Sequence, residues 1–261
     1  MQSLLQASRQ RGDSGRLLPP VWKSFAEKKI RFRRGQLYLI VAAPGVGKSV
    51  LAQTYALHSR ARSLYLTMDA DKHTTCVRIV QAAYLITQEA AEEGIEQGAE
   101  WAAEALKSVP WLKYAFPSGP DVHEIVEHVW AYAEVQGDWP DIIWVDNLDN
   151  VDCDEGENGR KTVMSDLQKL AHKTGSAVVV LHHAEGKYDD GHETIPQSGI
   201  LGKVAKTPSM VLTGCLGGFP GQMFWSVVKN RFGPADPSGR GVRAELWSDL
   251  QYMQITDKSD V

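Results

Sequence analysis

The sequence has few of the features that mark exported or membrane-spanning chains. Only three cysteines are present among its 261 residues, too few and too far apart for a disulfide framework or a paired zinc site. No run of roughly 18 apolar residues is available to cross a bilayer, and the first twenty residues lack the apolar core of a secretion signal. We therefore expect a cytoplasmic protein with reduced thiols and no membrane partner.

The chain also lacks a strong excess of one charge. Its net charge is −4, with 43% hydrophobic and 23% charged residues, which excludes intrinsic disorder and collagen-like order. The charge is uneven, because residues 1–34 contain nine basic and two acidic residues, a local charge of +7 that leaves −11 for the rest. A basic arm on an acidic body favours contact with nucleic acid or with an acidic neighbouring subunit, and a solvated tail is the alternative.

Proline and glycine place the expected domain boundaries. Residues 10–20 are rich in Gly, Ser and Arg and end in two prolines, which predicts a flexible basic arm over residues 1–20. The globular domain is expected over residues 21–250, and residues 251–261 are expected to form a C-terminal tail.

Short apolar runs alternate with helical patterns through most of the chain. Strands are expected over residues 37–42, 64–68, 112–116, 142–145 and 177–181. Helices are expected over residues 49–59, 72–107 with a break near Gly94 or Gly98, 121–136 and 159–173. This alternation predicts an α/β fold, a mostly parallel twisted sheet with helices on both faces. Strand patterns over residues 210–215, 224–229 and 242–247 predict a C-terminal antiparallel extension.

A phosphate-binding pattern follows the first expected strand. Residues 42–49, AAPGVGKS, match the Walker A loop, with Ala42 in place of the first glycine. Small residues let backbone N–H groups close around phosphate oxygens, Lys48 reaches the β- and γ-phosphates, and the Ser49 hydroxyl ligates Mg²⁺. The pattern predicts ATP and Mg²⁺ as ligands. The expected nucleotide contacts are Ala43, Pro44, Gly45, Val46, Gly47, Lys48, Ser49 and Val50.

A second acid completes the expected metal site. Asp146 ends the apolar run 142–145, as a Walker B aspartate does, and would lie beside the phosphate loop at the carboxyl edge of the sheet. An Asp at a strand end is also a common cap or turn residue. Its pairing with Ser49 favours magnesium ligation.

The order of these motifs resembles a known family. Walker A, Asp69 after the second strand, Asp146, the pair His182 and His183 after the fifth strand, and finally KNRFG at residues 229–233 resemble the RecA-fold motor domain of DnaB-type hexameric replicative helicases of phage or plasmid type. The resemblance covers residues 34–247. It implies a RecA-like P-loop core and Mg²⁺-dependent ATP hydrolysis. For a protein encoded by a phage, the expected location is the cytoplasm of the bacterial host cell.

The resemblance also implies catalytic roles. Asp69 matches the acid that polarises the attacking water, where the family usually has the longer Glu, so Asp71 is an alternative. His183 matches the polar γ-phosphate sensor, with His182 as the alternative if the register differs by one. Lys229 and Arg231 match residues that reach the γ-phosphate of a neighbouring subunit. Such a shared active site requires a homo-oligomer, a hexameric ring in this family.

DNA contacts are expected in the loops after Asp146 and after His183. Both loops are acidic, which departs from the family pattern, because a phosphate backbone needs positive potential or free N–H groups. Arg160 and Lys161 can add positive charge. The candidate contacts are Lys187, Lys203, Lys206 and an expected helix start at Ser198 and Gly199.

These expectations combine into a DNA motor. The resemblance implies a ring-forming ATPase that moves along single-stranded DNA or unwinds forked DNA during replication. No separate amino-terminal domain precedes the motor in this sequence, so a loader or primase is an expected partner. Two alternatives remain, a RecA/RadA-type recombination or DNA-processing ATPase, and a ring-forming ATP-dependent scaffold without nucleic acid.

Overall fold

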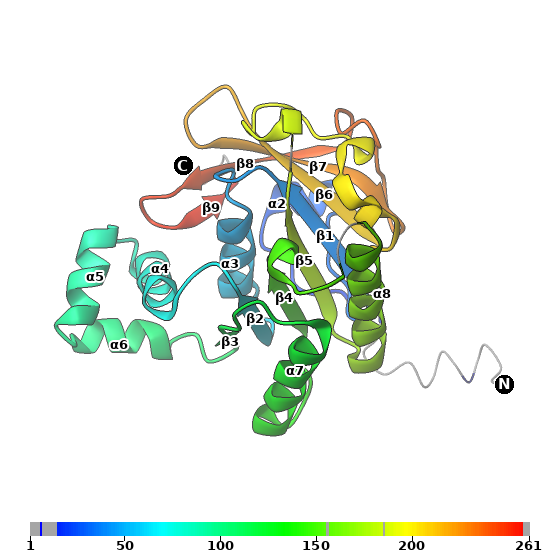
Figure 1. Ribbon diagram of the computed structural model, residues 1–261. Helices are drawn as coiled ribbons and strands as arrows, with labels where there is room; N and C mark the ends of the chain where they lie inside the picture. Colours follow the sequence, from blue (N-terminus) through cyan, green and yellow to red (C-terminus); the bar gives the residue numbers. More distant parts are fainter. Residues whose placement is uncertain (1–5, 7–14, 155–156, 185, 258–261) are drawn as a thin grey trace.

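A single sheet runs through the molecule in the computed structural model, which describes residues 6, 15–154, 157–184 and 186–257. Its strand order within these residues is β3-β2-β4-β5-β1-β6-β7-β8-β9 (Figure 1). The strands are β1 Leu37–Ala42, β2 Ser63–Thr67, β3 Leu112–Ala115, β4 Ile142–Asp146, β5 Ala177–His183, β6 Met210–Leu216, β7 Gln222–Asn230, β8 Arg243–Asp249 and β9 Gln254–Thr256. Neighbours from β3 to β6 pair in parallel, and β6 to β9 pair antiparallel. The expected RecA-like α/β fold with an antiparallel extension is confirmed.

Helices cover both faces of this sheet. They are α2 Lys23–Glu27, α3 Lys48–Ser59, α4 Lys72–Tyr84, α5 Gln88–Glu96, α6 Glu100–Lys107, α7 Val122–Gln136 and α8 Glu157–Thr174, with 3₁₀ turns η1 Leu148–Asn150, η2 Gly186–Tyr188, η3 Gln197–Gly199 and η4 Leu201–Lys206. Side chains of β1 point alternately to the two faces. Tyr38 and Ile40 pack with α2 and α3, whereas Leu39 and Val41 pack with α7 and α8.

The expected helix over residues 72–107 is three helices. Leu85 ends α4 in a left-handed conformation with φ 54°, and the side chain of Thr87 then caps α5. Residues 97–99 separate α5 from α6, close to the expected break. These helices share a small core of their own and project from one side of the sheet (Figure 1). The additional break at residue 85 was missed because apolar residues continue across it.

The expected C-terminal tail is wrong where the structure describes it. Strand β9 pairs with β8, and Ile255 is buried in the main core. The indole of Trp22 donates to the carbonyl of Ile255 at 2.8 Å. A three-residue strand carries too little pattern to predict, and it is ordered by its partner strand and α2.

The expected flexible arm is likewise too long at its C-terminal end. Leu18 is buried, and the Tyr55 hydroxyl donates to the carbonyl of Pro19 at 2.7 Å. The rest of that expectation falls on residues 1–5 and 7–14, outside the described residues. None of the described helices has the length and hydropathy needed to cross a membrane.

Candidate active site

The loop between β1 and α3 presents a ring of free backbone donors. Gly45 and Gly47 have φ values of 80° and 99°, which only glycine adopts readily. Within the described residues, the backbone N–H groups of residues 45 and 47–50 donate to no carbonyl or side chain. The residue before α3 supplies no side-chain cap. An open helix start of this kind fits phosphate oxygens, and it contains the expected nucleotide contacts.

Lys48 closes the inner side of this loop. Its side chain is buried, and Nζ donates to the carbonyls of Ala42 and Ala43 at 2.9 and 3.1 Å. Nζ also lies 3.0 Å from Nδ1 of His183. Burial lowers the pKa of Lys48 to about 8, although the negative charge of Asp146 opposes the shift. The ammonium therefore lies beside the phosphate-binding loop and is held by neutral carbonyl groups, which a bound phosphate can replace as its partners.

Ser49 and Asp146 meet at the carboxyl edge of the sheet. Asp146 ends β4 and is buried, and one carboxylate oxygen accepts from the Tyr65 hydroxyl at 2.8 Å. Burial raises the pKa of Asp146, while hydrogen bonds from Tyr65 and Ser49 oppose that rise. A hydroxyl and a carboxylate are the hard oxygen ligands that Mg²⁺ prefers. The pair fits the expected magnesium position.

Asp69 and Asp71 differ in their surroundings. Asp69 accepts from the side-chain amide of Asn147 at 2.6 Å and from that of Asn150. Asp71 instead caps α4, where it accepts from the backbone N–H and the hydroxyl of Thr74, both at 2.8 Å. Both acids line the same pocket, but only Asp69 is held by the segment that follows Asp146.

The two histidines at the end of β5 point to opposite faces. His183 faces the phosphate loop, with Nδ1 on Lys48 and Nε2 lying 3.0 Å from the amide nitrogen of Asn147. His182 is fully buried on the other face, where Nδ1 lies 3.1 Å from a carboxylate oxygen of Asp149. Burial lowers the pKa of His183, and the charge of Lys48 lowers it further. The imidazole of His183 is therefore neutral. It lies where the resemblance places the γ-phosphate sensor.

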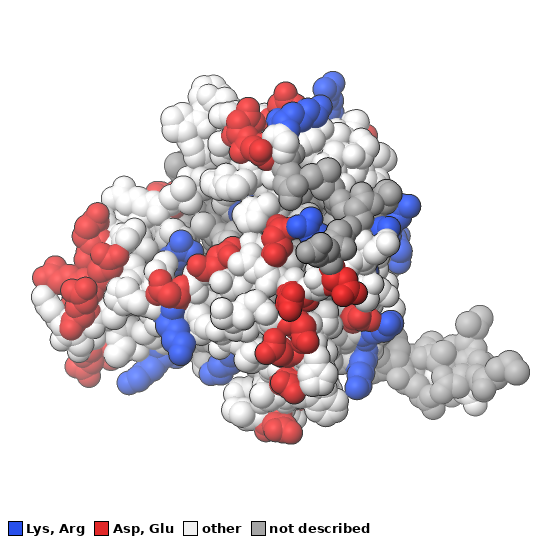
Figure 2. Space-filling view, viewed as in Figure 1, with Lys and Arg blue, Asp and Glu red and all other residues white. Residues whose placement is uncertain are grey.

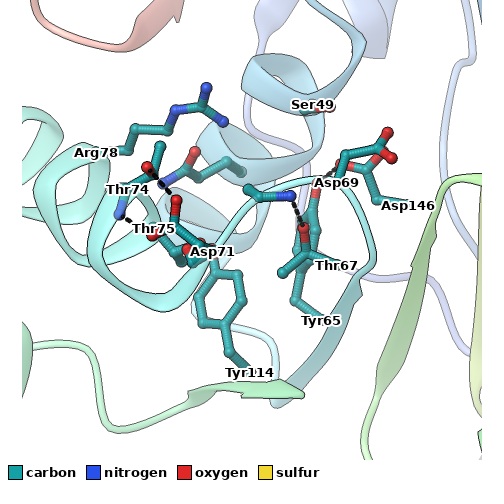
Figure 3. Close-up of a pocket in the computed structure, with 12 residues that line it drawn as sticks. Ser49, Tyr65, Thr67, Asp69, Asp71, Thr74, Thr75, Arg78, Tyr114 and Asp146 are labelled. Atoms are coloured by element: carbon teal, nitrogen blue, oxygen red, sulfur yellow. Dashed lines mark hydrogen bonds between the residues drawn. The ribbon is translucent and has the colours of Figure 1, made fainter. Parts of the chain in front are cut away.

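A pocket of about 250 Å³ opens beside Ser49 and Asp146 (Figure 3). Side chains of α3, β2, β3 and α4 line it, and they include Arg78, Gln53 and Tyr114. Sequence reasoning missed these three residues because they lie inside ordinary helix and strand patterns. It also missed Asn147 and Asn150, whose one available signal was their position directly after Asp146.

Lys229 and Arg231 lie at the opposite edge of the sheet. Strand β7 is antiparallel to β6, so Asn230 pairs with Met210, near the beginning of β1. About four residues of strand, roughly 13 Å, separate that level from the phosphate loop. The ammonium of Lys229 donates to the carbonyls of Ala205 and Lys206, and exposed Arg231 donates to that of Thr207 at 3.4 Å. Neither side chain lies near the phosphate loop of its own chain.

The candidate DNA contacts are partly brought together. Ser198 and Lys206 line one hollow of about 390 Å³ between η3, η4 and Pro237. Lys187 is exposed in η2, with its ammonium 4.9 Å from the ring centre of Tyr188. The side chain of Lys203 lies outside the described part of the structure.

The expected helix start at Ser198 and Gly199 is wrong. The turn η3 is only three residues long, and the N–H of Gly199 donates to the carbonyl of Pro196 at 2.9 Å. The neighbouring N–H groups of Gln197 and Ile200 also have carbonyl partners. The backbone donors of Gln197, Gly199 and Ile200 are therefore already used and are not free for a phosphate.

Arg160 and Lys161 were expected to add positive charge to the loop after Asp146. Arg160 forms an ion pair with Asp149 at 3.1 Å, and the Lys161 ammonium donates to the side chain of Asn158 at 3.2 Å. The charge of Arg160 is therefore largely neutralised by its own loop.

Comparison with known proteins identifies relatives of this chain. The model of the family described as AAA domain matches residues 29–187. The Gene 65 protein of Mycobacterium phage L5 is 39% identical over 257 residues, which cover 95% of each chain. The Gene 65 protein of Mycobacterium phage D29 is 35% identical over 235 residues, covering 85% of this chain and 99% of the relative.

Solved structures share the fold at low sequence identity. A structure described as an ATPase domain matches with a TM-score of 0.75 and 13% identity, over 97% of this chain and 95% of that one. A DnaB-like replicative helicase, described with its interactions with primase, matches with a TM-score of 0.72 and 14% identity, over 87% of this chain and 58% of that one. The RadB recombinase matches with a TM-score of 0.59 and 17% identity, over 92% and 99%.

Proposed function

The chain belongs to the AAA domain family of P-loop ATPases, and from that premise we propose that it is a Mg²⁺-dependent ATP hydrolase of the DnaB-like type. Its copies form a ring, a hexamer, in which hydrolysis drives movement along single-stranded DNA or unwinding of forked DNA during replication. The observation that supports this most is the convergence of Lys48, Asp69, Asp146 and His183 on one edge of the sheet. Arg231 lies on the other edge, available to a neighbour.

Hydrolysis needs a base near the terminal phosphate. Asp69 is the general base, accepting a proton from the water that attacks the γ-phosphorus as the bond to the ADP oxygen breaks. The products are ADP and inorganic phosphate. Asn147 and Asn150 hold the carboxylate of Asp69 in place by hydrogen bonds. Bound Mg²⁺ supplies charge neutralisation, with Ser49 and Asp146 as its protein ligands.

Lys48 and Asn147 compete for the same imidazole. A neutral histidine accepts a hydrogen bond at only one ring nitrogen, and His183 lies 3.0 Å from a donor on each side. When Lys48 turns to a phosphate, His183 is free to accept from Asn147, which also holds Asp69. Binding or loss of the phosphate in this way changes the hydrogen bonds of His183 at the end of β5, and this change is passed to the loop that follows.

The position of Arg231 supports a shared active site. It cannot serve its own phosphate loop from the far edge of the sheet, so its charge acts on the γ-phosphate bound by an adjacent copy. Lys229 can assist only after its ammonium leaves the carbonyls of Ala205 and Lys206. Engagement with a neighbour then changes the segment that contains Lys206.

DNA contact rests on the hollow lined by Ser198 and Lys206, together with exposed Lys187. Ser198 and Lys206 belong to the segment between His183 and β6. A movement at the nucleotide is therefore passed to the hollow through a short stretch of chain. A loader or primase is a further partner in this proposal, because the similar helicase structure is described with primase.

Two other functions have some support. The likeness to the RadB recombinase favours a recombination or DNA-processing ATPase. A ring-forming scaffold without nucleic acid is favoured by the acidic surface, which Figure 2 shows over α5 and α6 and along α7. The exposed acids of α5 and α6 are Glu89, Glu93, Glu96, Glu100 and Glu104.

One experiment separates these functions. The rate of ATP hydrolysis is measured across protein concentration, with and without single-stranded DNA. A motor shows a rate per chain that rises with concentration and is stimulated by DNA. A rate that DNA leaves unchanged contradicts a DNA motor and supports the scaffold. Strand displacement from forked duplexes, compared with joint-molecule formation, then distinguishes a helicase from a recombinase.

A further inference from the structure

The pocket beside Ser49 and Asp146 contains hydrogen-bond donors without partners. Gln53 is 5% exposed, and its amide nitrogen has no partner in the described part of the chain. Arg78, from α4, has neither a hydrogen bond nor an ion pair with any described residue, and the same holds for hydrogen bonds of the Tyr114 hydroxyl. Leaving the buried amide of Gln53 unpaired is costly, and together with the two partly exposed donors beside it this points to a missing ligand.

The acceptors that line the same pocket, in contrast, already have hydrogen-bond partners. The carboxylate of Asp69 is held by two asparagine amides, and that of Asp71 by Thr74. Asp146 accepts from the Tyr65 hydroxyl and from Ser49. The hydroxyl of Thr75 donates to a backbone carbonyl of its own helix. The pocket therefore combines carboxylates that already have partners with donors that have none, and the free donors suit a ligand made of acceptors.

The arrangement of charge narrows the ligand class. Figure 3 places Arg78 across the pocket from Asp69 and Asp146, so an anion would lie between a guanidinium and the proposed metal position. The volume of about 250 Å³ is several times the roughly 30 Å³ that one water molecule occupies in the liquid. A tetrahedral oxyanion with a few water molecules fits that space.

We propose that this pocket binds inorganic phosphate, the product of hydrolysis, after it leaves the nucleotide and before it reaches solvent. Arg78, Gln53 and Tyr114 are its donors. The nearby carboxylates weaken the binding by repulsion, which keeps this exit site from trapping the product. The identity of the anion as a reaction product rests on the proposed function, whereas the presence of an oxyanion site does not.

Equilibrium dialysis with radiolabelled orthophosphate tests the site without requiring turnover. The protein is held at saturating Mg–ADP, and wild type is compared with Arg78→Ala, Arg78→Lys and Gln53→Leu. We expect one phosphate per chain for wild type, binding at least about tenfold weaker for Arg78→Ala, and smaller losses for the other two variants. Arg240→Ala, which removes an exposed arginine from a distant turn, serves as the control and binds phosphate as wild type does.

Three results overturn the proposal. These are no phosphate binding by wild type, equal binding by wild type and Arg78→Ala, or an equal loss of Mg–ADP and phosphate affinity in Arg78→Ala, which would make Arg78 part of the nucleotide site. If Arg78→Ala does not fold, as judged by circular dichroism, Arg78→Lys and Gln53→Leu decide by the same criteria. Phosphate binding by a protein that hydrolyses no ATP contradicts the proposed function but leaves the oxyanion site standing.

Discussion

At the residue scale, the central side chain of the site has hydrogen-bond partners that a bound nucleotide can replace. Lys48 rests on two backbone carbonyls and a histidine rather than on a carboxylate. Burial of its ammonium lowers its pKa to about 8, although the negative charges of Asp146, Asp149 and Asp69 oppose the shift. A bound phosphate places a negative charge in direct contact with the ammonium of Lys48. Because that contact needs the protonated form of Lys48, nucleotide binding should depend on pH.

We expect nucleotide affinity to fall above pH 8. In the nucleotide-free protein, Lys48 is protonated below its pKa of about 8 and loses its proton as the pH rises through that value. Since phosphate binds the charged form, the dissociation constant of Mg–ADP should be about tenfold higher at pH 9 than at pH 7. Fluorescence titration with a labelled nucleotide measures this. In Lys48→Arg the step should disappear, and a step of the same size there would assign the titration to another group.

Asp69→Glu should keep or raise the rate of hydrolysis. The longer side chain brings the carboxylate nearer to the phosphate, whereas Asp69→Asn removes the base and should lose most turnover while it still binds nucleotide. Steady-state ATPase assays and nucleotide titrations measure both effects. Asp71→Asn is the matched control and should retain activity, because Asp71 is engaged in capping α4. A collapse of the rate in Asp71→Asn alone would move the base to that residue.

At the scale of elements, local signals predicted those helices and strands whose pattern is complete within a few residues. A capping box begins α7, since Asp121 accepts from the N–H of Glu124 at 2.8 Å and the Glu124 side chain accepts from that of Asp121 at 3.0 Å. The five expected parallel strands all exist within one or two residues of their expected ends. Elements that depend on distant partners, such as α2 and β9, were not predicted.

Asp121→Ala should lower the free energy of unfolding by about 1 kcal/mol, because the backbone N–H of Glu124 at the start of α7 loses its partner. Urea denaturation followed by circular dichroism measures the change. Glu134→Ala, at an exposed position near the end of the same helix, should change it by less than about 0.5 kcal/mol. Equal effects of the two substitutions would mean that the capping box contributes no stability.

At the scale of the whole molecule, the sheet separates the two halves of the proposed active site. The antiparallel return of β7 carries Arg231 to the edge away from the phosphate loop. A chain with this topology cannot complete its own site with Arg231, so efficient hydrolysis should require at least two copies.

Mixing two inactive variants tests this requirement. Arg231→Ala should bind ATP yet lose about 100-fold or more in turnover, and Lys48→Ala should not bind ATP productively. When mixed, some interfaces pair an intact phosphate loop with an intact Arg231, so part of the activity should return. Activity is followed against mixing ratio at constant total protein. An absence of recovery at every ratio would exclude a shared site.

The sequence by itself determined the phosphate loop, the acid that ends β4, the parallel order of strands and helices, and the acid and histidines at two further strand ends. These signals are local, because each depends on residue types at fixed spacing along one strand, turn or helix. Only the tertiary structure decided that His183 faces Lys48 while His182 turns away, and that Asn147 and Asn150 hold Asp69. It also decided that Arg78 lines the pocket and that Arg231 lies at the far edge. These contacts join segments that are distant in sequence, and the strand order and the face of each side chain determine which of them meet.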